Sequence, residues 1–481
     1  MDTRTRGLGE DWLSLWIGLV IFILSLGLLA GADILGWVVT TSVWTDASKA
    51  LSPVSKAYSG LGGAGAIVAT FVALLAVMTL GAAALKADVK RFAIGFTAVF
   101  WLAYACWIVG SWANFAVNTP ADMRKFGISW SLKLTSEGGF IVALLGGLFI
   151  GNFMPAFAEW MREAVRPELY VKTAIVILGG FLGVTAAEKL ALATSVMFLG
   201  LASIIVAYLI FWSVVYYVAR VWFGFSREWA APLASGISIC GVSAAIATGA
   251  AIRARPVVAI MVSSLVVIFA VVELLILPFL AQTFLAHDPL VAGAWMALSV
   301  KTDGAAVASG AITESLVYAR NAAEGVRYAP GWVLGTAATV KVFIDIFIGI
   351  WAFVLAYVWT RHIEVRPGGE AKAGEIWERF PKFIIGYVVT FLLILFLALG
   401  APPETMGKIK AAMGEANTFR GIFFVLTFFT IGVMSNFRKL WEEGIGKLAA
   451  VYVVCLFGFI IWVGLVISWV FFSGVKPPLA G

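Results

Sequence analysis

Long apolar segments recur along nearly the whole chain. We count about thirteen of them, and a helix needs about 20 residues to cross the hydrocarbon of a bilayer. Long runs of Val, Ile, Leu and Phe favour helices over a barrel, whose strands would be short and alternating. The sequence therefore predicts an all-α, polytopic membrane protein. The approximate segments are 13–32, 61–85, 92–115, 138–157, 171–187, 191–218, 230–251, 256–281, 290–313, 333–360, 381–400, 419–436 and 447–473.

Composition supports the membrane class and excludes several others. Hydrophobic residues make up 62% of the chain and charged residues 13%, whereas soluble domains average about 25% charged. The net charge is +7, but Lys and Arg lie mostly in short loops between spans, where lipid headgroups and the positive-inside rule explain them. We therefore expect membrane lipid, and no nucleic acid, as a partner.

Few side chains are suited to covalent or metal chemistry. Cys106, Cys240 and Cys455 lie in apolar stretches without a CxxC pattern, and the chain has only two histidines. No GxxxxGK[ST] phosphate loop is present. We expect a protein that is not an enzyme and that uses no cofactor and no metal.

Two short stretches depart from the composition of a membrane helix. Residues 236–251 and 299–313 are dense in Gly, Ala, Ser and Thr inside apolar neighbourhoods. Backbone that leaves a helix at membrane depth is tolerated only where protein buries it or water lines it. A pair of Gly-interrupted segments is also the best sequence indication of a transporter's binding site. We predict two interrupted helices here, as broken helices or as re-entrant hairpins.

The first stretch offers uncharged groups for a ligand. Ser238 and Ser243 supply hydroxyls, Gly241 can free a backbone amide, and Cys240 lies between them. A helix N-terminus carries partial positive charge and unpaired N–H groups that suit an anion. The alternative is close helix packing through small residues, with Cys240 as a small apolar packing residue.

The second stretch adds charge at Lys301 and Asp303. Lys301 would contribute positive charge to an anion site, while Thr302 or Asp303 would cap a new half-helix. A mutual ion pair that only fixes the fold is the alternative. Because a charge at the bilayer centre costs at least about 2.5–3.5 kcal/mol, ionisable residues there are functional candidates by default.

Three further charges lie within apolar segments. Glu273 has no opposite charge nearby in sequence, which suits a proton-coupling residue. The alternatives are a structural pair with a lysine from another helix and a neutral acid hydrogen-bonded to backbone. Lys341 and Asp345 share one helix face at i,i+4 spacing. They either pair with each other, or Lys341 turns toward the two interrupted segments while Asp345 joins Glu273 in ion coupling.

A faint internal repetition in the sequence also favours a secondary transporter. Residues 174–198 and 428–454 both read as a small-residue helix, a charged turn and a new helix. Internal repeats are common in secondary transporters, although chance similarity between apolar sequences is the rival explanation.

SGISICGVSAAIATGAAIRA, residues 235–254, resembles the ICGxSA signature of the family of proposed bacterial sulfate exporters (PSE). Looser matches follow in order along the chain, and the resemblance covers roughly residues 138–473. They are GLFIGNFMP at 147–155, VKTAIVILGGFLG, ATVKVFID ending at Asp345, and FTIGVMSNFRKL.

The chain departs from this family where the charges lie. Thr302-Asp303 stands where the family commonly has His-Asp, and Asp345 where it often has Arg. Glu273 stands where an uncharged residue is expected. The resemblance implies an anion transporter, while the rearranged charges put sulfate itself in question.

The resemblance implies a multi-pass protein of the bacterial inner membrane with an inverted repeat. We expect an N-terminal extension at 1–137, a transporter core at 138–481, and by analogy a homodimer. The predicted function is a secondary transporter, exporting sulfate, sulfite, a sulfonate or another small anion and driven by a proton or sodium gradient. An anion channel or a non-transporting sensor module is the alternative.

Overall fold

The structure of the chain is a computed structural model that describes residues 9–117, 120–132, 138–252, 254–359, 363, 381–436 and 446–480. Eight helices among the described residues are long and apolar enough to cross a membrane. This supports the predicted helical membrane class, while the number of about thirteen spans is not confirmed.

The chain forms two compact units. Unit 1 comprises Met1–Leu190 and Lys382–Ser435, and unit 2 comprises Ala191–Pro381 and Asn436–Gly481. The predicted division separates an N-terminal extension at 1–137 from a transporter core at 138–481 on the ground of the family resemblance. The two compact units do not test this division, which stays a prediction.

Unit 1 consists of helices and one small β-hairpin, in which β1 pairs with β2 in antiparallel register, with Val39 opposite Pro53. Its elements are α1 (Glu10–Ser25), β1 (Val39–Thr41), β2 (Leu51–Pro53), α2 (Gly62–Ala84), α3 (Val89–Gly110), α4 (Ala113–Ala116), α5 (Pro120–Phe126), α6 (Gly138–Phe153), α7 (Pro155–Trp160), α8 (Pro167–Glu188), α17 (Phe383–Ala398) and α18 (Pro403–Met434).

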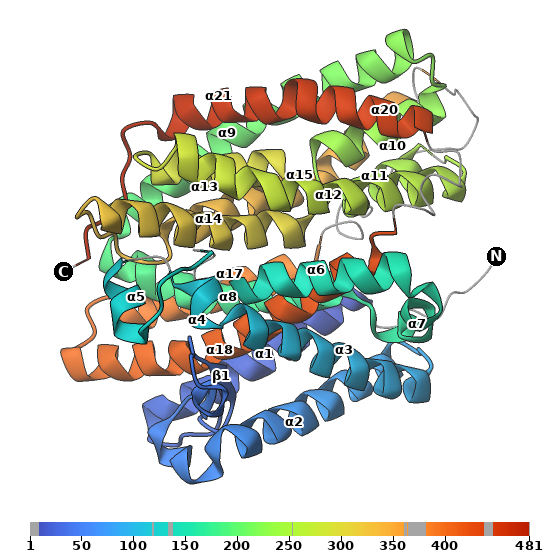
Figure 1. The fold of residues 1–481 in the computed structure, drawn as a ribbon. Coiled ribbons are helices and arrows are strands. Elements are labelled where there is room, and N and C mark those ends of the chain that lie inside the picture. The colour runs from blue at the N-terminus through green and yellow to red at the C-terminus, as the bar shows by residue number, and fades with distance from the viewer. Residues whose placement is uncertain are drawn as a thin grey trace. The chain divides into compact units, whose positions relative to one another are not determined.

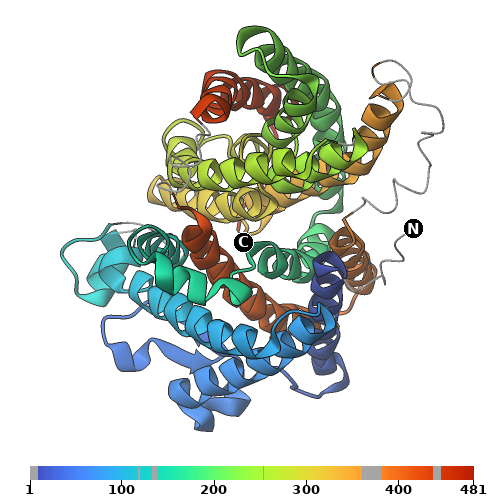
Figure 2. The ribbon, with the colours of Figure 1, turned by 90° about the vertical axis from the view of Figure 1, so that its right-hand side faces the viewer.

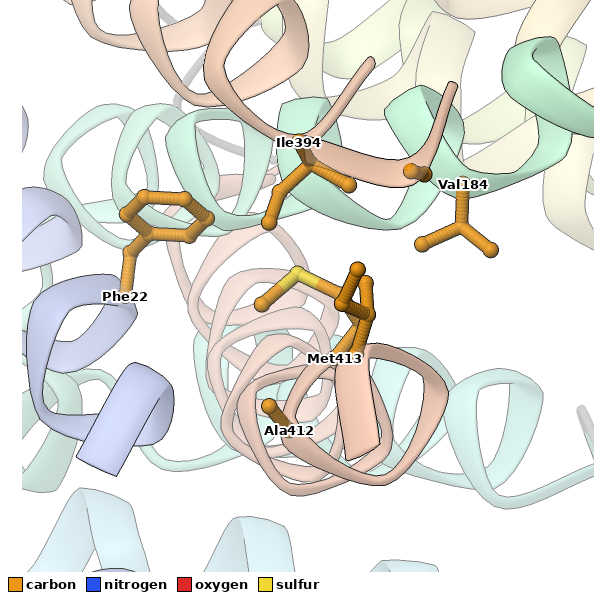
Figure 3. Packing of buried hydrophobic residues seen from close by; sticks show 7 residues of the cluster. Phe22, Val184, Ile394, Ala412 and Met413 are labelled. Atoms are coloured by element: carbon orange, nitrogen blue, oxygen red, sulfur yellow. The ribbon is translucent and has the colours of Figure 1, made fainter. Parts of the chain in front are cut away.

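Helix α8 is the centre of unit 1 and packs against α1, α17 and α18. A cluster of buried apolar side chains joins these four helices, including Phe22 of α1, Val184 of α8, Ile394 of α17 and Met413 of α18 (Figure 3). Gly179 lets α17 approach α8, since a Cβ there would lie 2.4 Å from the Tyr387 carbonyl oxygen. At the edge of the unit α2 packs on α3, both blue in Figures 1 and 2.

Unit 2 contains both Gly-rich stretches. Its elements are α9 (Leu190–Tyr217), α10 (Arg227–Ser238), α11 (Gly241–Ala251), α12 (Pro256–Phe284), α13 (Pro289–Ser299), α14 (Asp303–Ala323), α15 (Trp332–Val358), α20 (Gly446–Cys455) and α21 (Ile461–Phe472).

Helices α10 and α11 form a helical hairpin, called the first hairpin below. The Thr248 hydroxyl lies 2.7 Å from that of Ser235, so α11 folds back along α10. At the open end of the hairpin, Arg255 forms an ion pair of 2.9 Å with Glu228. The closed end, at residues 238–241, is its tip.

Helices α13 and α14 form the second hairpin and run side by side (Figure 1). At its open end the Asn321 amide donates to the Ala286 carbonyl oxygen at 2.7 Å, and His287 lies 3.7 Å from Glu324. Its tip lies at residues 299–303. Pro256 and Pro289 begin α12 and α13, where the missing N–H of proline costs no hydrogen bond.

Helix α12 joins the open ends of the two hairpins. Its 29 residues span about 43 Å. The first hairpin therefore enters unit 2 from one end of α12 and the second from the other, so that their tips meet part-way along it. Both stretches thus form helical hairpins within segments 230–251 and 290–313.

Candidate functional site

The two hairpin tips contact each other through backbone. The Gly241 amide, at the start of α11, donates to the Lys301 carbonyl oxygen at 2.6 Å. Only glycine fits here, because a Cβ at Gly241 would lie 2.1 Å from Val266 Cγ1 of α12. Thr302 caps α14, its hydroxyl accepting from the Ala305 amide at 3.2 Å. The predicted cap is confirmed, with Thr302 rather than Asp303 as the N-cap.

Lys301 and Glu273 are linked at the second tip. The Lys301 amide donates to Glu273 Oε2 at 3.1 Å, and the Tyr452 hydroxyl of α20 lies 3.3 Å from Oε1. The Lys301 ammonium group donates to the Leu298 carbonyl oxygen and lies 5.1 Å from the centroid of the Phe211 ring of α9. Lys301 is 1% exposed and Glu273 0%.

Asp303 and Lys341 link the second tip to the first. Asp303 Oδ1 accepts from the Cys240 thiol at 2.6 Å and lies 3.7 Å from Lys341 Nζ. The same ammonium group lies 3.4 Å from the Ile239 carbonyl oxygen at the end of α10. Lys341 therefore faces the Gly-rich segments, as the second predicted alternative expects, while its pairing with Asp345 is not tested. Asp345, one helical turn further along α15, offers a ligand atom within 4.8 Å of those of Cys240 and Asp303.

The charges match the ends of the half-helices. A helix carries about half a positive charge at its N-terminus and half a negative charge at its C-terminus. Lys301 and Lys341 bind carbonyl groups where α13 and α10 end, while Asp303 lies in the first turn of α14. Two N-termini and two C-termini meet here, so their partial charges largely cancel.

Cys240, Asp303 and Asp345 are a thiol and two carboxyl groups that could surround a cation. The Lys341 ammonium group, 3.7 Å from Asp303, already provides a positive charge at that position. The arrangement is thus a buried network of opposite charges around two broken helix ends.

The structure brings together nine of the ten predicted site residues, namely Ser238, Cys240, Gly241, Glu273, Lys301, Thr302, Asp303, Lys341 and Asp345. Ser243 lies in α11, and its side chain is outside the described part of the structure. Their proximity does not test the roles predicted for them.

Sequence reasoning missed two residues of the network. Tyr452 contacts Glu273, and Phe211 faces Lys301. A tyrosine in an apolar helix is a weak signal, since a buried hydroxyl usually has a partner, and nothing in sequence identifies that partner.

The two hairpins also share a sequence pattern. ISICGVSAAIATGA (237–250) and LSVKTDGAAVASGA (298–311) align without gaps at an offset of 61 residues, with six identities. The aligned serines, Ser238 and Ser299, are the last residues of α10 and α13. Among the described residues neither buried hydroxyl has a hydrogen-bond partner. Residues that align in sequence therefore occupy equivalent positions in the two hairpins.

Comparison with known proteins places the chain among membrane proteins named only by family. A family model described as "Conserved hypothetical protein 698" matches residues 126–451. A UPF0324 membrane protein of Nitrosomonas europaea is 41% identical over 98% of this chain and 97% of its own length.

Two other relatives are similar over different shares of the chain. A UPF0324 membrane protein of Rhodopirellula baltica is 30% identical over 86% of this chain and 67% of its own. An uncharacterized protein of Archaeoglobus fulgidus is 51% identical over 30% of this chain and 88% of its own. No solved structure matches the chain.

Proposed function

From the premise that the chain belongs to the Conserved hypothetical protein 698 family and is a UPF0324-type membrane protein, we propose that it is a secondary active transporter of a small anion. The observation that carries the proposal is the meeting of two opposed hairpin tips in a buried cluster of charges. Buried charges within membrane segments mark substrate and ion pathways, and half-helix ends at mid-membrane form the binding sites of secondary transporters.

The proposed substrate is sulfate, sulfite, a sulfonate or a similar small anion. Lys301 and Lys341 provide positive charge, and Ser238, Ser243 and Thr302 provide hydroxyls. Cys240, Gly241 and Asp303 hold the two tips together. Glu273 and Asp345 couple transport to a proton or sodium gradient. The resemblance to proposed sulfate exporters supports the substrate class, and we propose an inner-membrane homodimer on the same ground.

The opposed hairpins suggest how the site opens alternately. Both lysines are 1% exposed, so an anion reaches them only after the tips have separated from their surroundings. Each hairpin enters from a different end of α12. Opening the first hairpin exposes the tips toward one side of the membrane, and opening the second exposes them toward the other. The shared pattern of residues 237–250 and 298–311 supports the proposed inverted repeat, because related halves would move in related ways.

Replacing Lys301 by Ala tests the proposed binding site. We expect the purified variant to fold but to lose thermal stabilisation by sulfate, sulfite and methanesulfonate, because a ligand stabilises only a protein that binds it. Lys447→Ala, which removes an ammonium group from the start of α20 beside Phe225, is the matched control and should keep the response.

Normal stabilisation and transport by the Lys301→Ala variant would show that the site is assigned wrongly. Anion conductance that needs no gradient and is insensitive to Glu273→Gln would favour a channel. Stabilisation without any flux would favour a sensor module.

A further inference from the structure

Among the described residues, the buried network around the hairpin tips has one more acidic than basic side chain. Glu273, Asp303 and Asp345 are three carboxyl groups, whereas Lys301 and Lys341 supply two ammonium groups. All five side chains are at most 2% exposed. The four helix ends contribute two partial charges of each sign and do not change the balance.

An anion adds a further negative charge to this closed set. Moving uncompensated charge out of water costs several kcal/mol per ion even after the protein relaxes. A cation that binds with the anion removes that cost, since it keeps the total charge of the site constant. The surroundings of each carboxyl group then decide where such a cation can bind.

Glu273 is the carboxyl group best placed to take up a proton. Asp303 already has the Cys240 thiol and the Lys341 ammonium group as partners. Glu273 faces the Lys301 amide and the Tyr452 hydroxyl. An amide N–H cannot coordinate a metal cation, whereas a tyrosine hydroxyl can turn from donor to acceptor and accept a hydrogen bond from the protonated carboxyl group.

The other ionisable groups around Glu273 do not take over its role as the proton-binding group. Lys301 lies at the adjacent tip, and Lys341 of α15 is occupied by Asp303 and Ile239. The Cys240 thiol of the first tip donates a hydrogen bond to Asp303. Asp345 of α15 lies on the Asp303 side of the network, beside Cys240.

We infer that the anion and a proton move through the site together. Glu273 carries the proton, and Tyr452 positions the Glu273 carboxyl group. The inference rests on the proposed function. Glu273 binds a proton from the side on which the anion enters, and both leave on the other side. An inward proton gradient then drives uptake of the anion, in contrast to the export implied by the family resemblance. Glu273 takes up one proton, so a monovalent anion moves without net charge, whereas a divalent anion moves with one net negative charge.

Full-length protein in proteoliposomes tests the direction of coupling. Methanesulfonate and sulfate serve as probes because their charges are constant near neutral pH, and valinomycin with equal potassium holds the membrane potential at zero. With a gradient of about one pH unit, co-transport should accumulate methanesulfonate about tenfold on the alkaline side for each proton moved. The result does not depend on the orientation of the protein in the vesicle.

Two variants separate coupling from binding. Glu273→Gln should still exchange labelled for unlabelled methanesulfonate but should lose accumulation driven by the pH gradient. Tyr452→Phe keeps the carboxyl group and should shift the pH at which accumulation is half-maximal. Glu324→Gln, an exposed change at the open end of the second hairpin, should behave as the unmodified protein. Size-exclusion profiles and thermal unfolding confirm that each variant folds.

Accumulation on the acid side, or full gradient-driven accumulation by Glu273→Gln, would overturn co-transport through Glu273 while leaving anion transport intact. Absence of exchange for both probes at every pH, with folded protein, would overturn the proposed function and this inference together.

Discussion

Asp303 is contacted by side chains from two different elements, the Cys240 thiol and the Lys341 ammonium group. Neither contact follows from distance in sequence, since the three residues lie on the first hairpin, the second hairpin and α15. Asp303 and Lys341 offset each other's charge, so replacing either one leaves the other buried without this partner.

Lys341→Met should destabilise the protein strongly. Removing one partner of a buried pair costs about 3–5 kcal/mol, because the remaining charge is left buried. The measurement is the free energy of unfolding in detergent, and the double variant with Asp303→Asn should lose much less than the sum of the two single variants. Lys408→Met, which breaks the exposed 3.0 Å pair with Glu404, should cost at most about 1 kcal/mol. A similar loss in both lysine variants would argue against a coupled buried network.

At the scale of elements, small residues determine how closely the hairpins approach α12. The glycines Gly236, Gly249 and Gly241 face Val262, Ala259 and Val266 in turn. These contacts follow one face of α12 from its beginning toward Glu273 and Lys301. The glycine backbone of the first hairpin therefore packs directly against side chains of α12, which brings the tip of this hairpin to the level of the second tip.

Gly241→Ala and Gly249→Ala should differ sharply although both lie in α11. A Cβ at Gly241 would lie 2.1 Å from Val266 Cγ1, whereas one at Gly249 would lie 3.4 Å from Ala259 Cβ. Overpacking costs about 1–3 kcal/mol, so Gly241→Ala should lower the thermal unfolding temperature and slow anion exchange. Gly249→Ala should be neutral or slightly stabilising, since alanine favours a helix.

Val266→Ala combined with Gly241→Ala makes space for the new methyl group and should restore part of the loss. Failure of this rescue would show that the contact with α12 is not the reason for glycine at the tip.

At the scale of the whole molecule, the chain passes between its two compact units three times, near residues 190, 381 and 435. The two stretches with the faint predicted repetition, 174–198 and 428–454, both contain a passage from unit 1 to unit 2. Unit 1 is built around α8, and the charged hairpin tips lie wholly within unit 2.

Opposed hairpins predict opposite accessibility of their open ends. In a Cys106→Ser background, a membrane-impermeant maleimide should label Glu228→Cys from one side of the membrane and Glu324→Cys from the other. Cys240 and Cys455 are buried and should not react with the maleimide added on either side of the membrane. Labelling of both introduced cysteines from the same side would contradict the arrangement of the hairpins around α12.

Sequence alone determined the membrane class and the location of the candidate site. Both follow from transfer energies, since apolar segments enter a bilayer and buried polar stretches are tolerated only where neighbouring protein compensates them. The Thr302 cap was also predictable, because capping depends on a few adjacent residues.

Only the tertiary structure decided that the two stretches are hairpins, and that Lys341 reaches Asp303 and Tyr452 reaches Glu273. A straight broken helix and a hairpin have the same composition and the same helix propensity on either side of the break. What separates them is the packing of α10 and α13 against helices distant in sequence. The same packing chooses the partner of each buried charge, because within a low-dielectric interior position in space, rather than distance along the chain, sets the energy of a pair.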